Sequence, residues 1–191
     1  MLEPQYSDIH SRKEVDTAVR TKTMGDLRIP IISSPMDTVT ESAMAASMSQ
    51  HGGLGIIHRY NSIEVQSNIV KKSLNSGASI VGVAVGVSGD YIDRACSAYD
   101  SGARVICVDI AHGHHILMRN AIDELRDIFS LSVHIMAGNV ATLEAFNDLS
   151  DWGADSIRVG VGGGSICSTR IQTGHGVPTL QSIINCSYSD R

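Results

Sequence analysis

The stretch Gly102-Ala103-Arg104-Val105-Ile106-Cys107-Val108-Asp109 carries the strongest fold signal of this sequence. Its glycine follows a helix pattern over Asp90–Asp100 and supplies the left-handed residue that commonly ends a helix. The apolar run from Val105 to Val108 is continuous, which is typical of a parallel strand buried on both faces. The stretch therefore predicts a helix end, a buried strand and then a polar strand terminus at Asp109.

The same arrangement repeats along the chain about every 25 residues, the length of one strand, one helix and two loops. Gly77-Ala78 and Gly153-Ala154 close helix patterns in the same way, and Gly52-Gly53 does so after the first helix. We expect strands at Ile29–Ser33, Leu54–His58, Ser79–Val85, Arg104–Asp109, Val133–Ala137 and Ser156–Val161. We expect helices at Thr40–His51, Ser62–Asn75, Asp90–Asp100, Ile116–Phe129, Leu143–Trp152 and Thr179–Cys186, with N-terminal signals at Glu41 and Thr142.

Six βα units leave two architectures, an open doubly wound sheet or a (β/α)8 TIM barrel. A barrel usually has eight strands and about 250 residues, so the count alone favours the open sheet. Unusual residues nevertheless follow the ends of most strands: Ser34–Asp37, His58-Arg59, Asp109–His115, Gly138-Asn139 and Gly160–Arg170. Because that distribution is typical of a barrel mouth, we expect an incomplete α/β TIM barrel that forms a single domain over residues 1–191.

Composition excludes several classes of protein. The chain of 191 residues is 42% hydrophobic, which argues against disorder. Its net charge of −5 and its 4% aromatic content argue against a nucleic-acid partner. No apolar run reaches the roughly 18 residues of a membrane span, and Met1–Lys22 lacks a signal peptide's apolar core. The four cysteines include no C-x-x-C pair, so we expect a reduced, cytoplasmic protein without a membrane partner.

The cysteines are not equivalent. Cys96 and Cys107 lie in apolar patterns and are expected to be core thiols. Cys167 follows a glycine-rich run and is flanked by Arg158 and Arg170, so it is a candidate nucleophile. Composition alone leaves a catalytic and a structural role equally open. The loop can turn its N–H groups toward a phosphate or its carbonyls toward a cation, and it lacks the context of a Rossmann fingerprint.

Two other segments have simpler interpretations. His112, His114 and His115 could ligate a metal, but neither an H-E-x-x-H helix nor a carboxylate cluster accompanies them. We therefore expect no zinc or other transition metal there, and we regard Asp109 as a better candidate for binding ribose hydroxyls. In Ser33–Glu41, Pro35 should stop the strand, and Thr40 or Asp37 should cap the following helix.

Several strings together resemble the family of IMP dehydrogenase and GMP reductase. They are SSPMDTVTE (33–41), GGLGIIHR (52–59), DIAHGH (109–114), AGNVAT (137–142) and RVGVGGGSICSTRIQTGHGVP (158–178). The resemblance runs through the whole chain in the family's order, and MDTVTE and GGLGIIH look more like IMP dehydrogenase. The regulatory CBS modules that the family's dehydrogenases usually carry have no room between Ser62–Gly77 and Ser79.

The resemblance implies a role for each candidate residue. Cys167 would attack C2 of IMP, with Thr169 beside it. Binding of NAD, or of NADPH in a GMP reductase, would fall to Asp109, Asn139, Arg158, Gly160 and Gly162. The purine nucleotide would contact Ser34, Met36 and Ser165. The backbone carbonyls of Gly162, Gly164 and Cys167 would form a monovalent-cation site for K⁺.

The resemblance also implies that parts of the barrel lie outside this sequence. A strand pair would precede Pro4–Ile9, and the seventh and eighth βα units would follow, with the A-D-G-G-I site, a second phosphate loop and the flap that activates water. We therefore expect a partial barrel of an IMP dehydrogenase, a homo-oligomer as in the family's tetramers. GMP reductase remains an alternative, as does a non-catalytic partial barrel that acts as an interaction partner.

Overall fold

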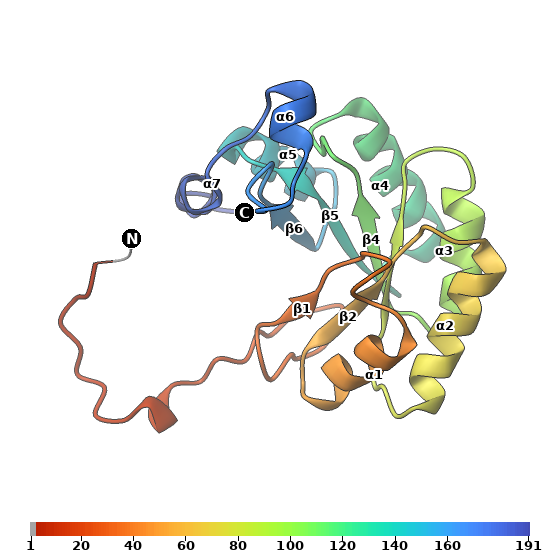
Figure 1. Cartoon of the computed structure of the whole chain (residues 1–191), viewed down its shortest axis with the longest axis horizontal. Coiled ribbons are helices and arrows are strands. Elements are labelled where there is room, and N and C mark those ends of the chain that lie inside the picture. Colours follow the sequence, from red (N-terminus) through yellow and green to blue (C-terminus); the bar gives the residue numbers. More distant parts are fainter. Residues whose placement is uncertain (1–2) are drawn as a thin grey trace.

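The computed structural model describes residues 3–191, whose strands form one parallel sheet in the order β1 to β6. The strands are β1 (Ile32–Ser33), β2 (Leu54–Ile57), β3 (Gly82–Val85), β4 (Val105–Asp109), β5 (His134–Val140) and β6 (Ser156–Val159). Figure 1 shows the sheet curled, with helices on its outer side. Consecutive strand order excludes the doubly wound sheet and confirms the prediction of an incomplete barrel of six βα units.

Helices alternate with the strands as predicted. They are α1 (Ser42–Gln50), α2 (Ile63–Asn75), α3 (Tyr91–Asp100), α4 (Ile116–Phe129), α5 (Leu143–Asp151), α6 (Thr169–Thr173) and α7 (Thr179–Cys186), with a 3-10 turn at Arg12–Glu14. The glycine caps are confirmed, because φ is 91° at Gly77, 107° at Gly102 and 106° at Gly153. The Thr142 side chain accepts from the Ala145 amide, as its N-cap position predicts. No helix within residues 3–191 has the length and apolar character needed to cross a membrane.

The start of α1 differs from the prediction. Neither Thr40 nor Asp37 caps the helix: the N-cap residue is Glu41, whose side chain makes no capping hydrogen bond. The buried Thr40 hydroxyl instead donates to the Ser34 carbonyl over 2.6 Å. Glu41 Oε1 lies 3.2 Å from Nε2 of the buried His58. These polar groups tie together the loops that follow β1 and β2.

Side chains bury both faces of the sheet. In β4, Ile106 and Val108 pack outward in a cluster with α4 residues such as Met118 and Ile122. Val105 and Cys107 alternate with them and face the interior, where they join Leu54, Ile56, Ala84 and Met136. The continuous apolar run that predicted β4 therefore arises from two separate cores, as expected for a parallel barrel sheet.

Strand bounds depart from the prediction mainly at the edges. β1 covers only Ile32–Ser33 of the expected Ile29–Ser33, and β6 ends at Val159. Each edge strand pairs with a single neighbour. All four residues of β6 are only half-buried, because no further strand among residues 3–191 lies beyond it. β5 instead runs past its predicted end, since Gly138 pairs in register with β4 and with β6.

A segment that precedes β1 covers the end of the sheet where the strands begin. Val19 and Leu27 form an antiparallel bridge, and Leu27 and Met24 pack against the interior apolar cluster. The buried His134 connects this segment to the sheet. Its Nδ1 lies 2.8 Å from Thr23 Oγ1, and its Nε2 lies 2.7 Å from Ser156 Oγ.

We predict that His134 makes folding sensitive to mild acid. Burial lowers the pKa of His134, so the unfolded chain takes up its proton first as the pH falls. The free energy of unfolding should therefore decrease as the pH falls from about 7 to about 5, through the ordinary histidine pKa. Urea unfolding at several pH values measures this dependence.

His134→Gln should flatten that dependence, whereas His10→Gln, at an exposed histidine without a side-chain hydrogen bond within residues 3–191, should leave it unchanged. An identical pH dependence in wild type and His134→Gln would contradict the prediction.

Candidate active site

Three adjacent strands bring an ion pair to the rim where they end. Register places Asp109 beside Gly138 and Gly138 beside Arg158. A Cβ on Gly138 would lie 2.7 Å from the Arg158 Cβ, so only glycine leaves the arginine this path past β5. Arg158 Nη1 consequently forms an ion pair with Asp109 Oδ1, and both side chains are largely buried. The strand register and one missing side chain thus create the central charged pair.

Asn139 completes this group, which we call the rim cluster: Asp109, Asn139 and Arg158. Asn139 Nδ2 donates to Asp109 Oδ1 and to the Ile110 carbonyl, each over 3.1 Å. Asp109 Oδ2 has no hydrogen-bond partner within residues 3–191. The carboxylate is therefore held through one oxygen, while the other is free to accept from a ligand hydroxyl.

The cysteine lies on an excursion from the end of β6. Val161 and Val177 form an antiparallel bridge that closes the base of this segment, which we call the cysteine loop (162–176). Gly162 has φ of 75°, in the left-handed region. A Cβ on Gly163 would lie 2.0 Å from Thr179 Oγ1 at the start of α7, so the loop passes that helix only without a side chain. Glycines therefore fix the path of the loop toward Cys167.

Cys167 has the environment of a reactive thiol. Its Sγ donates to Thr169 Oγ1 over 3.3 Å. Hydrogen bonds from Thr169 lower the pKa of Cys167, and the positive charge of Arg170 acts in the same direction. Burial has the opposite effect elsewhere: it raises the pKa of Cys107 to about 12 and also raises the pKa of Cys96 and Cys186. Among the four free thiols, Cys167 is therefore the one that ionises most readily.

The carbonyls predicted to bind K⁺ are partly engaged within the loop. The Gly164 carbonyl accepts from Arg170 Nη2 over 3.3 Å and from the Cys167 amide over 3.2 Å. A guanidinium thus already supplies positive charge at that oxygen. An ion held jointly by Gly162, Gly164 and Cys167 would share the Gly164 carbonyl with Arg170, and the K⁺ site stays a prediction.

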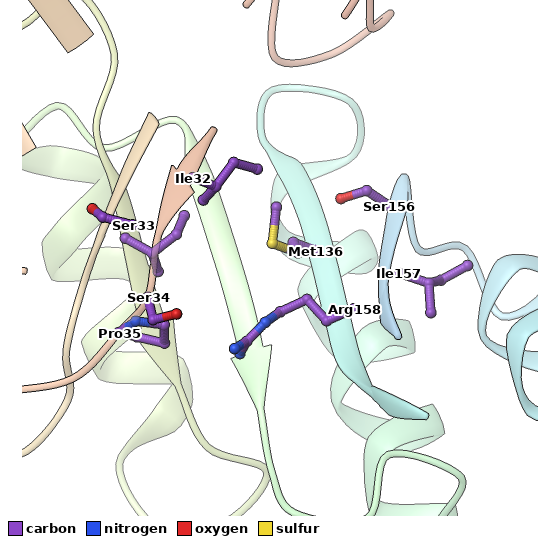
Figure 2. A pocket seen from close by; sticks show the side chains of 9 residues that line it. Ile32, Ser33, Ser34, Pro35, Met136, Ser156, Ile157 and Arg158 are labelled. Carbon is purple, nitrogen blue, oxygen red and sulfur yellow. The ribbon is translucent and has the colours of Figure 1, made fainter. Parts of the chain in front are cut away.

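A pocket of ≈ 220 Å³ opens between β1 and β6 on the inner side of the sheet. Figure 2 shows Ser34 and Pro35 on one wall and Ile157 and Arg158 on the other, with Arg158 extending toward the end of β4. Ser34 therefore lines the same pocket as Arg158 of the rim cluster. Met36 is exposed and does not line the pocket.

The predicted residues thus form two groups rather than one. Ser165 is exposed on the cysteine loop, and Gly160 lies half-buried at its base. Within residues 3–191, no hydrogen bond or ion pair joins the cysteine loop to the rim cluster. Both groups nevertheless follow the carboxyl ends of strands, the edge at which barrel enzymes place their active sites.

Two of the three neighbouring histidines, His114 and His115, have hydrogen-bond partners. His114 Nε2 lies 2.8 Å from Asp148 Oδ2, and His115 caps α4 by accepting from the Leu117 amide. Within the described residues, no three histidine, cysteine or acidic side chains are grouped as metal ligands. The expectation of no transition metal here stays a prediction.

Sequence reasoning gave no role to a polar network beneath the loop that follows β2. Gln66 Nε2 donates to the His58 and Ala84 carbonyls over 2.9 and 3.0 Å, and the buried Arg94 donates to the Asn61 carbonyl over 2.9 Å. These side chains face inward from α2 and α3, whose helix patterns carried no functional signal. The strand-end position of His58-Arg59 was the signal that pointed to this loop.

Comparison with known proteins now adds to the geometry. The model of the "IMP dehydrogenase / GMP reductase domain" family matches residues 1–191. The chain belongs to this family. An inosine-5′-monophosphate dehydrogenase of Cryptosporidium parvum is 36% identical over 98% of the chain and 56% of its own length. A GMP reductase of Leishmania major is 28% identical over 98% of the chain and 65% of its own length.

A solved structure agrees with the fold. A cysteine-to-alanine variant of GMP reductase from Trypanosoma brucei superposes with a TM-score of 0.88 at 27% identity, over 96% of this chain and 70% of that one. The chain thus spans about 56% to 65% of the first curated relatives it matches. Family membership and the partial barrel are confirmed, while relatives of both activities leave the reaction open.

We predict that Thr169 accounts for much of the reactivity of Cys167. Thr169→Val removes the hydroxyl but keeps the side-chain shape, so the pKa of Cys167 should rise. Alkylation of Cys167 near pH 7.5 should slow about threefold or more, because each pKa unit changes the thiolate fraction up to tenfold. Mass-mapped labelling with limiting reagent measures the rate at each cysteine.

In the wild type, Cys167 should react before Cys96, Cys107 and Cys186. Thr173→Val is the matched control, since that hydroxyl donates to the Thr169 carbonyl rather than to the thiol. Equal labelling rates in Thr169→Val and wild type would show that the hydroxyl does not activate the cysteine.

Proposed function

We propose that the chain carries part of the single catalytic barrel, without CBS modules, of a purine nucleotide oxidoreductase of the IMP dehydrogenase type. The reaction is oxidation of IMP to XMP with NAD. The observation that carries this proposal is Cys167, a thiol whose pKa is lowered on a loop at the end of β6. Family membership supplies the purine nucleotide chemistry.

Cys167 would act as the nucleophile. Its thiolate would form a bond to C2 of the purine, an electrophilic carbon between two ring nitrogens, and the hydrogen at C2 would leave as hydride. Bound NAD supplies the hydride acceptor. Water would then attack the same carbon, release XMP and return the thiol. Thr169 lies within 3.3 Å of Sγ and can donate to the thiolate before the attack and after product release.

The rim cluster fits the ribose of a dinucleotide. Asp109 has one oxygen held by Asn139 and Arg158 and one oxygen free for a hydroxyl. Gly160 and Gly162, which follow β6, are proposed to contact the cofactor through their backbone. Ser34, Met36 and Ser165 are proposed for the nucleotide substrate. K⁺ is proposed at the carbonyls of Gly162, Gly164 and Cys167, where it would share the Gly164 carbonyl with Arg170.

GMP reductase is the second candidate, with the same cysteine and NADPH as reductant for the deamination of GMP to IMP. Relatives with that name, including the solved structure, support it. MDTVTE and GGLGIIH favour the dehydrogenase. A non-catalytic partial barrel is the third candidate, and the half-buried β6 and the exposed Ile32 of β1 favour it, since both edges can pair with a partner.

Location and assembly form part of the same proposal. All four cysteines are free thiols, which fits the reducing cytoplasm. Ile183 and Ile184 of α7 are largely exposed, as is Ile171 of α6, and exposed apolar side chains support a homo-oligomer.

We predict that residues 1–191 alone do not sustain turnover of IMP. The chain spans about 56% to 65% of the curated relatives, and catalytic groups in one site act cooperatively, so the absence of several costs more than their separate contributions. NADH formation by the purified chain, with a full-length relative as the positive control, measures this. Slow formation of a covalent adduct at Cys167 is compatible with the prediction.

Multiple turnovers that Cys167→Ala abolishes would contradict the prediction and show that these residues suffice. Oxidation of NADPH with GMP, but no reduction of NAD with IMP, would favour the second candidate.

A further inference from the structure

We infer that Arg59 is an anion-binding residue that takes the phosphate of a ribose-linked ligand held at the rim cluster. Arg59 follows His58 directly after the end of β2. Its Nη2 reaches the Asp109 carbonyl at 3.5 Å, so the guanidinium stands beside the carboxylate proposed to hold a ribose. The inference rests on the proposed function for the assignment of a ribose to Asp109. The assignment of an anion-binding site to Arg59 does not depend on that function.

The guanidinium of Arg59 is left short of acceptors. Its Nε is buried without a hydrogen-bond partner, and no carboxylate within residues 3–191 lies close enough to pair with Arg59. By contrast, the half-buried Arg126 and Arg158 each pair with an aspartate. A buried donor without a partner is costly, and a charged one more so. An anionic ligand at the terminal nitrogens would supply the charge partner that the guanidinium lacks.

The surroundings hold Arg59 in place for such a ligand. Gln66 and Arg94 fix the backbone on either side of it by donating to the His58 and Asn61 carbonyls. The Arg59 guanidinium carbon lies 5.7 Å from the centre of the Tyr60 ring, within the range of a cation–π contact. Because these contacts exist without a ligand, little side-chain freedom is lost when one binds.

The terminal nitrogens of Arg59 lie beside the loop that follows β3. A Cβ built on Gly86, the residue after β3, would lie 3.6 Å from Arg59 Nη1, an ordinary van der Waals distance. Arg59 Nη1 has no hydrogen-bond partner within residues 3–191, and Nη2 has only the long contact to the Asp109 carbonyl. These two terminal nitrogens can bind two oxygens of one phosphate in a bidentate manner.

The carboxylate of Asp109, beside Arg59, indicates which class of anion would bind. The 5′-phosphate of a nucleotide is separated from its ribose by only one methylene and one oxygen. A ribose on Asp109 Oδ2 would therefore carry its phosphate close to Arg59. Both the pyrophosphate of a dinucleotide and the phosphate of a mononucleotide have this chemistry.

The test is calorimetric titration of the full chain with NADH, IMP, inorganic pyrophosphate and nicotinamide riboside, which lacks the phosphate. Arg59→Gln should weaken binding of pyrophosphate and of at least one nucleotide about tenfold or more and leave the riboside unchanged, since charge-assisted hydrogen bonds are lost. Arg59→Lys keeps the charge and should recover part of the affinity. Arg119→Gln, an exposed arginine on α4, is the matched control for folding and net charge.

The different probes distinguish the anion site at Arg59 from the proposed function. A selective effect on NADH assigns the anion to a dinucleotide, and a selective effect on IMP assigns it to a mononucleotide. Arg59-dependent binding of pyrophosphate without nucleotide binding by the wild type would support the anion site and contradict the proposed function. Equal binding of every probe by wild type and Arg59→Gln, or no binding by the wild type, would overturn the inference.

Discussion

The register of β4, β5 and β6 is the constraint on which the candidate site depends. Parallel pairing aligns Asp109, Gly138 and Arg158 across three strands, and the side chain missing at Gly138 allows the outer two to meet. A shift of one residue in either pair would turn one of these side chains toward the helices. The rim cluster is therefore a direct product of how the strands are aligned.

Burial on both faces maintains that register. The outer face of the sheet packs against the helices, while Val105, Cys107 and Met136 fill the inner face. Since alternate residues enter separate cores, a slip in one strand would expose apolar side chains in both. The cysteine loop is free of this constraint because it leaves the sheet after β6, and its own glycines and the Val161–Val177 bridge hold it.

The sequence predicted the repeating units well, because each has an apolar run and a glycine cap that act locally. Ile116–Phe129 was predicted with its observed bounds. The short α6 was missed, since its five residues are too few to show a helical period. β5 was predicted too short because Gly138 and Asn139 are typical of loops, and only their neighbours on β4 and β6 reveal that they belong to the strand.

For the candidate site, the sequence indicated residue types but not how the residues are arranged. Asp109 stood out as a polar residue at a strand end and Arg158 as a cation beside the glycine-rich run, and their pairing follows from the register. The engagement of the Gly164 carbonyl by Arg170 was not predictable, because it depends on a side-chain conformation set by the loop. The strand-end position marked Arg59, but its lack of acceptors emerges only when the packing of α2 and α3 is known.

The central claim is that Cys167 is an activated thiol at a purine nucleotide site. The most direct test is the rate of alkylation of Cys167 with and without saturating IMP, followed by mass mapping, with Cys186 as the internal reference. The account predicts that IMP slows alkylation of Cys167 and leaves Cys186 unaffected. An unchanged rate at Cys167 with IMP bound elsewhere on the chain would contradict it.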